Sequence, residues 1–402
     1  MAKTNHIPVL IVGGGPTGLF LALSLSNLGI DCRVIEKNEA PTQHSRSIGI
    51  HPPSLELFDR LGLVKPFLQE GILIRKGHAY LNQSWIGMVG FDSLPAPHQY
   101  VLSLPQSQTE TILEAACQEV DSSMVRRGVT LTSYETTQDG VRVHMQAAHG
   151  AKSTDGDVEE ATCDILVGCD GKRSVVRELA GIAFNGSHYP DTYMMGDFED
   201  TTPFGEDAMI TLHQDGLVEC FPLAKGRRRW VVKTAQYVDA PTEQELKEIV
   251  AHRTGFDLRQ AQCTMTSSFG VQHYIAETFA KGRVVLAGDA AHVVSPIGGQ
   301  GMNLGWLDGE ALAKALHAFL STQNERHLQD YSKRQRSIAR QAGKRAEWNM
   351  RLGRSFKNRW VKRWMLYLFV RTPIQRVLAQ LFTMQKNLQK LIHGLLITTN
   401  YK

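Results

Sequence analysis

The feature that most constrains this chain is a cluster of glycines that interrupts an apolar run near the N-terminus. The segment PVLIVGGGPTGLFLALSLSNLGIDCRVIEK predicts a strand, a glycine turn, a helix and a second strand. Gly13, Gly15 and Gly18 form the pattern GxGxxG, which in a dinucleotide site provides a tight turn, room for a pyrophosphate and close helix–strand packing. The helix that begins near Pro16 directs free N–H groups toward the phosphates. A glycine turn without a ligand is the alternative.

Glu36 narrows the type of dinucleotide that this turn can bind. It ends the second predicted strand, where a carboxylate accepts hydrogen bonds from a ribose 2′-OH and repels a 2′-phosphate. The sequence therefore favours the adenosine half of FAD or NAD over NADP at this turn. Thr17 and Lys37 lie beside the turn and beside Glu36, and we include them in the predicted site.

Two later stretches show the same order of strand, turn and helix. In CDILVGCDGKRSVVREL, a predicted strand ends before Asp170–Gly171, and a short helix carrying Ser174 and Arg177 follows. In RVVLAGDAAHVVSPIGGQGMN, a strand ends before Asp289, and glycines precede a predicted helix. Three strand ends then point to one crevice. NAD would contact only the first, whereas a larger cofactor with a polyol chain and a tricyclic ring would contact all three.

These three motifs resemble those of the class A FAD-dependent aromatic hydroxylases, of the para-hydroxybenzoate hydroxylase type. After the GxGxxG pattern, DGKRSVVR over 170–177 matches the DG region of that family, and GDAAHVVSPIGGQGMN over 288–303 matches its GD region. GMNLGWLDGEALAKAL is also similar to the ubiquinone-biosynthesis hydroxylases within the group. The resemblance implies an α/β fold with a Rossmann-like FAD-binding domain, a substrate domain built on a mixed or antiparallel sheet, and a C-terminal helical segment.

The resemblance also implies roles for single residues. Asp289 would accept hydrogen bonds from the ribityl hydroxyls, and the loop 298–303 would place backbone N–H groups against the flavin edge that becomes anionic on reduction. Arg46 and Gln106 stand where relatives have cofactor-contacting side chains; a surface salt bridge and a helix-start residue are their alternatives. Ser295 departs from the pattern, because many relatives have a proline there.

The predicted site consists mainly of cofactor-contacting positions. They are Gly13, Gly15, Pro16, Thr17, Gly18, Glu36, Lys37, Arg46, Gln106, Asp170, Gly288, Asp289, Gly299, Gly301, Met302 and Asn303. We place the chemistry at the flavin-edge loop, at Pro296, Gly298 and Gly299, and assign no side-chain acid or base and no metal ligand. His292 has two interpretations, a proton shuttle or, as we favour, a helix-start histidine that holds the backbone near the cofactor. Candidates for lining a substrate cavity are Met194, His213, Phe221 and Trp230.

The activity that the resemblance implies is that of a FAD-dependent monooxygenase consuming NADPH or NADH and dioxygen. Such an enzyme would hydroxylate an aromatic, polyketide-like or quinone-like small molecule through a flavin hydroperoxide. The sequence has no second glycine fingerprint for the nicotinamide cofactor, and the resemblance implies that this cofactor binds transiently across the cleft between the domains. The alternatives are a flavin reductase or halogenase of the same fold, or a catalytically silent flavin- or metabolite-binding protein. The halogenase is disfavoured because no WxWxIP segment occurs.

The motifs divide the chain into a discontinuous FAD-binding domain and a substrate domain. The first would comprise residues 1–75, 101–180 and 281–350, and the second residues 76–100 and 181–280. The hairpin GVTLTSYETTQDGVRVHM, with Asp139–Gly140 in its turn, would add an antiparallel ribbon to the first.

The C-terminal segment 351–402 would form basic helices, since it holds eleven Lys or Arg and no Asp or Glu. We favour packing on the FAD-binding domain; a membrane-surface anchor is the alternative. No nucleic-acid-binding fold accompanies the charge. The six cysteines show no metal-ligand spacing, and no apolar stretch reaches the roughly 18 residues of a membrane span. We therefore expect a cytoplasmic protein, with membrane association through this segment as the alternative.

Overall fold

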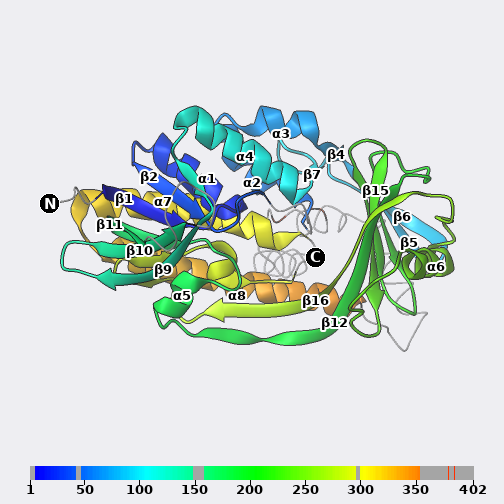
Figure 1. Ribbon diagram of the computed structural model, residues 1–402. Coiled ribbons are helices and arrows are strands. Elements are labelled where there is room, and N and C mark those ends of the chain that lie inside the picture. Colours follow the sequence, from blue (N-terminus) through cyan, green and yellow to red (C-terminus); the bar gives the residue numbers. More distant parts are fainter. Residues whose placement is uncertain are drawn as a thin grey trace, which may run out of the picture.

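The computed structural model describes residues 5–41, 47–147, 158–295 and 299–353, together with Ala379 and Met384. Within these residues the chain forms two large sheets, joined by a small three-stranded sheet. Figure 1 shows the two large sheets at opposite ends of the molecule, with helices packed around the first and on the outer side of the second.

The first sheet has a parallel centre formed by the strands that precede the three predicted turns. Its order is β17-β18-β11-β1-β2-β8, and the ribbon β9–β10 pairs with β11. The strands are β1 (Asn5–Val12), β2 (Cys32–Glu36), β8 (Val125–Arg127), β9 (Val129–Thr136), β10 (Val141–Ala147), β11 (Val158–Gly168), β17 (Ala280–Lys281) and β18 (Val284–Leu286). Strands of a parallel sheet are covered on both faces, which is why β1 is an almost continuous apolar run.

Helices cover this sheet. They are α1 (Pro16–Asn27), α4 (Gln106–Val120), α7 (Gln300–Thr322) and α8 (Arg326–Gly353), with the short helix α5 (Val175–Leu179) after β11. The helix α1 is buried on nearly all sides from Gly18 to Leu25, because it packs against α4 and α7 as well as the sheet. The hairpin predicted with Asp139–Gly140 in its turn is present as β9–β10, where the Thr137 N–H donates to the Gly140 carbonyl.

The second sheet takes its strands from two distant parts of the chain. Its order is β19-β16-β12-β15-β14-β13-β5-β6. The strands are β5 (Lys76–Leu81), β6 (Ser84–Gly90), β12 (Phe184–Glu199), β13 (Ala208–Leu212), β14 (Val218–Leu223), β15 (Arg227–Thr234), β16 (Cys263–Ala276) and β19 (His292–Val293). The last of these, β19, comes from a segment that the sequence assigned to the other domain. The long strands β12 and β16 extend from this sheet back beneath the first sheet and its helices, which we call the first body (Figure 1).

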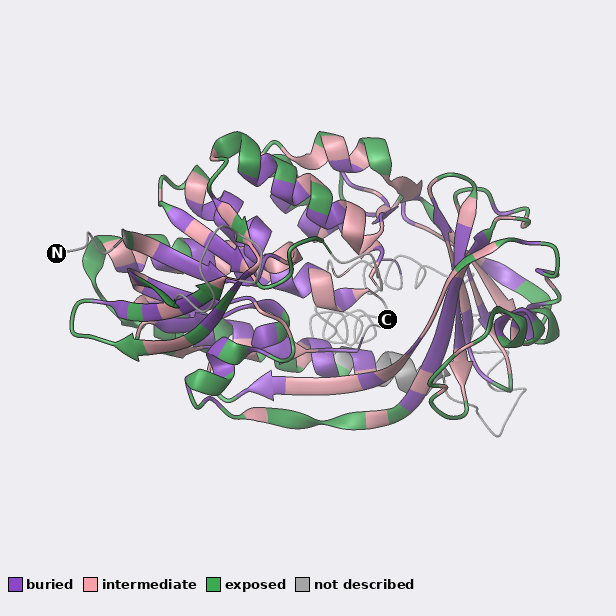
Figure 2. Cartoon of the chain, viewed as in Figure 1, coloured by how far each residue is buried: buried purple, intermediate pink, exposed green. Residues whose placement is uncertain are grey.

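One face of the second sheet is covered by the helix α6 (Glu243–Thr254), which begins with a capping box at Thr242 and Glu245. Side chains of the sheet and of α6 interlock in a separate core that includes Met194, Trp230 and Leu246. Figure 2 shows the outer side of α6 exposed and the strands beneath it buried. The sequence candidates Met194 and Trp230 therefore pack under α6, on the face that points away from the first sheet.

The small three-stranded sheet lies between the first body and the second body, which is the second sheet with α6. It consists of β3 (Gly49–Ile50), β7 (Val101–Ser103) and β4 (Ile72–Ile74), and the helices α2 (Pro52–Arg60) and α3 (Val64–Glu70) lie between its strands in sequence. The Ser103 hydroxyl donates a hydrogen bond of 2.6 Å to the Pro222 carbonyl of β14. This contact fixes the second sheet to the small sheet.

The predicted C-terminal helices lie outside the described residues, except for two positions. Ala379 is buried in a cluster with Ile74, Phe91 and Leu94, and Met384 packs against a cluster that includes Val294. None of the helices in the described part of the chain has the length and apolarity needed to cross a membrane.

Candidate functional site

The ends of the four central parallel strands lie side by side at one edge of the first sheet. Val12 is in register with Ile35 on one side and with Gly168 on the other, and Gly168 is in register with Leu286. Three of these strands are followed at once by one of the predicted turns, and β2 ends with Glu36. The carboxyl edge of a parallel sheet is where open α/β folds bind ligands. The structure thus brings the three glycine-marked turns to one place.

The first turn is shaped by two glycines that have no room for a side chain. Gly13 has a φ of +112°, and a Cβ there would lie 2.4 Å from the Cys169 carbonyl oxygen. A Cβ on Gly18 would lie 2.0 Å from the Gly13 carbonyl oxygen. Gly15 differs, because no atom lies within 4 Å of its Cβ position. It is the N-cap of α1 and supplies no side-chain hydrogen bond, so the first N–H groups of the helix face open space beside it.

Glu36 lies directly against this turn. Its Oε2 accepts a hydrogen bond of 2.8 Å from the Gly14 N–H, and its Oε1 accepts bonds from the backbone and side chain of Asn38. Oε1 thus uses both of its lone pairs, whereas Oε2 has one left, to which a ribose hydroxyl can donate. Lys37 is exposed next to Glu36, and Pro16 and Thr17 occupy the first turn of α1.

The second turn contains a buried carboxylate with a free oxygen. Asp170 accepts a hydrogen bond from the Val176 N–H through Oδ2, whereas its buried Oδ1 has no partner among the described residues. Burial raises the pKa of this carboxyl. The Asp170 backbone N–H lies close to Gly13, since a Cβ at Gly13 would be 2.7 Å from that nitrogen. The first and second turns therefore face each other directly.

Arg177 ties the second turn to the third. Its Nη1 donates a 2.9 Å hydrogen bond to the Ala290 carbonyl, and its Nη2 donates another of 2.9 Å to the Lys172 carbonyl. The guanidinium carbon also lies 3.9 Å from the centroid of the Phe184 ring. The sequence placed Arg177 on the short helix but gave no indication of these contacts.

The third turn is a 3₁₀ turn, η1 (Gly288–Ala290), and it is packed against the first. A Cβ at Gly288 would lie 2.6 Å from the Thr17 Oγ1. The Asp289 side chain is exposed between two buried neighbours, Gly288 and Ala290, and makes no hydrogen bond among the described residues. The surrounding protein nevertheless disfavours its ionised form and raises its pKa. A carboxylate so placed has all of its acceptor capacity available to a ligand.

His292 is held by a buried ion pair. Its Nε2 lies 2.5 Å from the Asp308 Oδ2, and that same oxygen accepts a 3.1 Å hydrogen bond from the Gly288 N–H. Burial alone would lower the pKa of His292, but Asp308, with a smaller effect of Asp289, outweighs burial and raises it. His292 belongs to strand β19, not to a helix start as the sequence suggested. Its contacts hold the backbone of the third turn, as in the favoured interpretation.

The loop predicted to face the flavin is described only from Gly299 onward; Pro296 and Gly298 lie outside the described residues, as does Arg46. Gly299 is the N-cap of α7 with a φ of +65°. The Asn303 side chain donates to the Gly49 and Gly299 carbonyls and accepts from the His51 N–H and the Ser54 hydroxyl. The Asn303 side chain is therefore fully engaged with protein and is not available to a cofactor.

Other predicted positions have varied surroundings. Met302 is partly buried against the main core. Gly301 has one atom, of Val294, within 4 Å of its Cβ position. Gln106 begins α4, and its side-chain amide donates a 2.8 Å hydrogen bond to Glu110. This hydrogen bond within α4 agrees with the alternative in which Gln106 is a helix-start residue, and the cofactor contact of Gln106 stays a prediction.

A comparison with protein families identifies the family to which this chain belongs. The family described as FAD binding domain matches residues 6–346. The chain belongs to this family. A FAD-binding edge fits the geometry above, because Gly15 leaves open space at the helix start, Asp170 has a free buried oxygen, and Asp289 has an unengaged carboxylate.

Relatives within the family are named for oxygenation reactions. An uncharacterized aromatic compound monooxygenase of Bacillus subtilis is 35% identical over 315 residues, covering 77% of this chain and 61% of the relative. A rifampicin monooxygenase of Streptomyces venezuelae is 35% identical over 319 residues, covering 77% of this chain and 64% of the relative. The chain thus spans a little less than two thirds of the length of these two relatives.

Solved structures show the same fold. An anhydrotetracycline hydroxylase from Streptomyces rimosus has a TM-score of 0.76 and 30% identity, covering 94% of this chain and 76% of the other. A p-nitrophenol 4-monooxygenase from Pseudomonas putida has a TM-score of 0.84 at 22% identity, covering 95% of this chain and 99% of the other. The mixed α/β architecture of this FAD binding domain protein is therefore that of the flavin-dependent hydroxylases.

Glu219 on the second sheet was missed by the sequence analysis. It lies on β14 between Val218 and Cys220, which point into the core beneath α6, so its own side chain points to the opposite face. The residues paired with it across the strands are apolar, Val231 on β15 and Ile210 on β13. Glu219 makes no hydrogen bond or ion pair among the described residues, and burial raises its pKa to about 7.

The face that carries Glu219 is directed toward the first body. Three residues along the strand, about 10 Å away, Pro222 accepts the hydrogen bond from Ser103 of the small sheet. Phe221, also on this face, packs against the cluster that contains Ile74. Of the four cavity candidates named from the sequence, Phe221 alone lies here; His213 lies at the far end of β13.

The sequence around Glu219 and Asp308 contained signals that could have pointed to these two residues. In VECFPL, Glu219 is the one charged residue in an otherwise apolar strand. It lies between two apolar residues that share the other face of the strand, so its side chain is expected on the face opposite to theirs. Asp308 lies between Leu304 and Leu312, one helical turn or so from each, on what is otherwise an apolar stripe. A charged residue on a buried stripe requires a partner. The sequence could have indicated that need, but it could not have identified His292 as the partner.

Proposed function

We propose that this FAD binding domain protein is a monooxygenase that hydroxylates an aromatic, polyketide-like or quinone-like small molecule with dioxygen, using NADPH or NADH as the electron donor. The observation that carries the proposal is the convergence of three turns at the carboxyl edge of the first sheet, opposite a second sheet that presents Glu219. The relatives named above support the reaction type. FAD, when bound, supplies the redox and oxygen chemistry.

The residues of the cofactor edge would divide the work of binding. The open position at Gly15 and the uncapped start of α1 would receive the pyrophosphate. Glu36 would accept a bond from the adenosine ribose, and Asp289 would accept bonds from the ribityl chain. The backbone N–H groups at the start of α7, after Gly299, would stabilise negative charge on the reduced flavin ring.

Glu219 would serve the substrate. A carboxyl with a pKa near 7 in apolar surroundings can take a proton from a phenolic hydroxyl and return it at neutral pH. Removing that proton makes the aromatic ring more electron-rich and therefore more reactive toward an electrophilic oxygen donor. Glu219 is the one such group that we assign on this face; the neighbouring Asp197 is already engaged by Arg229 in two hydrogen bonds of 2.7 and 2.8 Å.

The first experiment is the visible spectrum of the desalted protein, followed by NADPH and NADH oxidation in air. We expect FAD in a one-to-one ratio, bleached by the nicotinamide and restored by oxygen. Anhydrotetracycline and p-nitrophenol, compounds in the names of two neighbours, serve as first probes, with product mass as the readout. Bound FAD that neither reduced nicotinamide can bleach would overturn the monooxygenase proposal.

A second candidate is a non-oxidative reaction on the same scaffold. A dialkyldecalin synthase of Streptomyces rugosporus is 32% identical over 315 residues, covering 74% of this chain and 64% of the relative, and its name states no oxygenation. FAD binding without NADPH or NADH consumption, in the presence and absence of the probes, would favour this candidate.

A further inference from the structure

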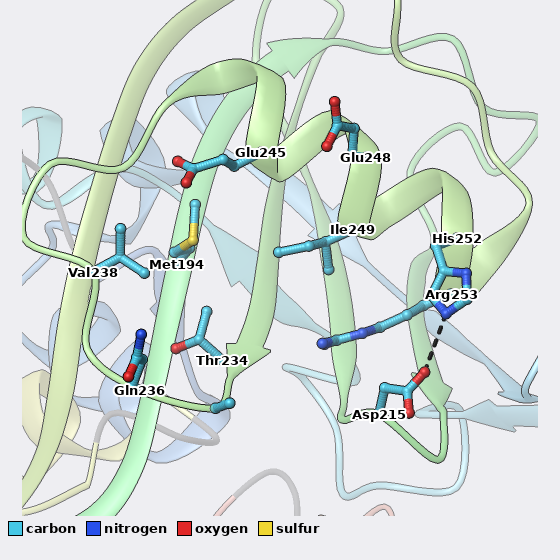
Figure 3. Close-up of a pocket in the computed structure, with 11 residues that line it drawn as sticks. Met194, Asp215, Thr234, Gln236, Val238, Glu245, Glu248, Ile249, His252 and Arg253 are labelled. Carbon is cyan, nitrogen blue, oxygen red and sulfur yellow. Dashed lines mark hydrogen bonds and ion pairs between the residues drawn. The ribbon is translucent and has the colours of Figure 1, made fainter.

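Three potential metal ligands meet at the outer end of the second sheet, far from the cofactor edge. His213 and Asp215 belong to the turn between β13 and β14, and His252 lies in the last turn of α6. Figure 3 shows Asp215 facing His252 at one end of a pocket of about 400 Å³, beside Arg253. Among the described residues, this is the single group of three that could hold a metal ion.

The distances between the ligand atoms suit a tetrahedral ion. The His252 Nε2 lies 3.1 Å from the Asp215 Oδ2, and the His213 Nδ1 lies 3.4 Å from the same oxygen. All three ligand atoms lie within 4.8 Å of one another. Around tetrahedral Zn²⁺, with bonds of about 2.1 Å, neighbouring ligand atoms are about 3.4 Å apart. Two of the three separations are thus already close to those around such an ion, and the third is at most 4.8 Å.

The end of α6 also suits a cation. His252 lies at the C-terminal end of α6, where the free carbonyls favour a positive charge.

Two features oppose the ion, and neither blocks it. The Asp215 N–H donates a 3.2 Å hydrogen bond to the His213 Nδ1, which must be exchanged for the metal bond. The Arg253 guanidinium repels a cation, but its Nη1 is engaged by a 2.6 Å hydrogen bond to the Lys233 carbonyl. Glu245 and Glu248, which also line the pocket, oppose its charge.

We propose that His213, Asp215 and His252 bind a divalent transition-metal cation of the Zn²⁺ type. Two imidazole nitrogens and one carboxylate oxygen are a ligand set that zinc accepts, and the fourth position is left for water or a pocket ligand. The bound ion would fasten the β13–β14 turn to the end of α6. The site is independent of the proposed flavin chemistry, since it lies on the α6 side of the sheet.

The test is a calorimetric titration of Zn²⁺ into the FAD-loaded, tag-free protein at pH 7.5. We expect one Zn²⁺ per chain with micromolar affinity, and a loss of about tenfold or more in His252→Ala, because one of three ligands is removed. His317→Ala is the matched control: His317 is exposed on α7, as His252 is exposed on α6, and its removal leaves the affinity unchanged.

Asp215→Asn provides a second variant that preserves the size of the side chain. Zn²⁺ should raise the melting temperature of the wild type and of His317→Ala, and raise those of Asp215→Asn and His252→Ala clearly less at the same concentration, because weaker binding to the folded state gives less stabilisation. Both substituted positions are exposed, and the flavin spectrum confirms that each variant is folded. Wild-type protein that shows no saturable binding, or equal affinities in all four proteins, would overturn the proposal.

Discussion

The cofactor edge of the first sheet and the inward face of the second sheet are built from different parts of the chain. At the cofactor edge, glycines leave backbone N–H groups accessible, and the charged residues Asp308 and His292 neutralise each other beneath the turn. On the second sheet the chemistry depends on side chains, and Glu219 has no partner among the described residues. The first arrangement tolerates almost no change of shape. The second depends on side chains, and we expect it to tolerate substitutions more readily.

The largest effect expected from this contrast is at Gly18. Gly18→Ala places a Cβ 2.0 Å from the Gly13 carbonyl oxygen, and the overlap should destabilise the protein by about 3 kcal/mol or more and abolish FAD binding. Gly15→Ala is the matched variant, because its Cβ position is open. It should unfold at nearly the wild-type urea concentration while binding FAD more weakly, since the methyl group occupies the approach to the pyrophosphate. Equal FAD affinity in Gly15→Ala and wild type would contradict the assignment of this turn.

The buried ion pair should produce the next largest effect. Asp308→Asn keeps an acceptor for the Gly288 N–H but removes the charge opposite His292, and it should lower the free energy of unfolding by about 3 kcal/mol at pH 6. The pKa of His292 is raised by folding, so its stabilisation is complete below the unfolded pKa and is lost as pH rises through the folded pKa. The difference between variant and wild type should therefore shrink on going to alkaline pH.

Asp59→Asn is the control for that experiment. The Asp59 carboxylate lies 3.9 Å from His98 and is 52% exposed, so solvent screens the interaction. Urea denaturation across the pH range should show almost no change in this variant. A pH-independent deficit in Asp308→Asn would show that packing, and not charge, holds the third turn.

Asn303 should show a smaller effect, divided between stability and cofactor affinity. Asn303→Ala removes hydrogen bonds to Gly49, Gly299, His51 and Ser54, and should lower the free energy of unfolding by about 2 kcal/mol. FAD affinity should fall as well, because these bonds fix the start of α7 relative to β3. Fluorescence titration with FAD measures the affinity. A loss of stability without any change in FAD affinity would show that the hydrogen bonds of Asn303 do not contribute to cofactor binding.

An effect of similar size but opposite sign, present only at higher pH, is expected at Glu219. Folding raises the pKa of this carboxyl from 4.5 to about 7, so between these pH values the unfolded chain releases a proton that the folded chain retains. Stability contributed by this group therefore falls as pH rises from 4.5 to 7. Glu219→Gln should be more stable than wild type by about 2 kcal/mol at pH 8, allowing for partial exposure, and equal to it near pH 4.

Glu199→Gln is the control for Glu219, because Glu199 is exposed on the same sheet. The same variants test the functional assignment. Glu219→Gln should keep FAD and its reduction by nicotinamide, while losing the pH dependence of product formation near neutrality. Unchanged pH profiles in Glu219→Gln would refute the proton-transfer role and leave the monooxygenase proposal intact.

Much of the cofactor edge followed from the sequence, because its determinants are local. The turns at Gly13, Asp170 and Asp289 were each recognised from a buried strand, small residues and a helix start within one short segment, and the shared family confirms the FAD assignment. The sequence also separated the strands at 76–90 from the rest of the N-terminal region. It did not decide the orientation of Met194 and Trp230, which pack under α6, since either face of a strand could have pointed toward the first sheet.

The sequence by itself determined the parallel sheet, its glycine turns and the cofactor class, because backbone conformation and hydrophobic periodicity depend on neighbouring residues. Only the tertiary structure decided which groups meet across long separations. The pairing of His292 with Asp308, the isolation of Glu219 and the meeting of His213 and Asp215 with His252 depend on how helices and sheets pack. Electrostatic interactions act through space over a few ångströms, and the order of residues along the chain does not specify those distances.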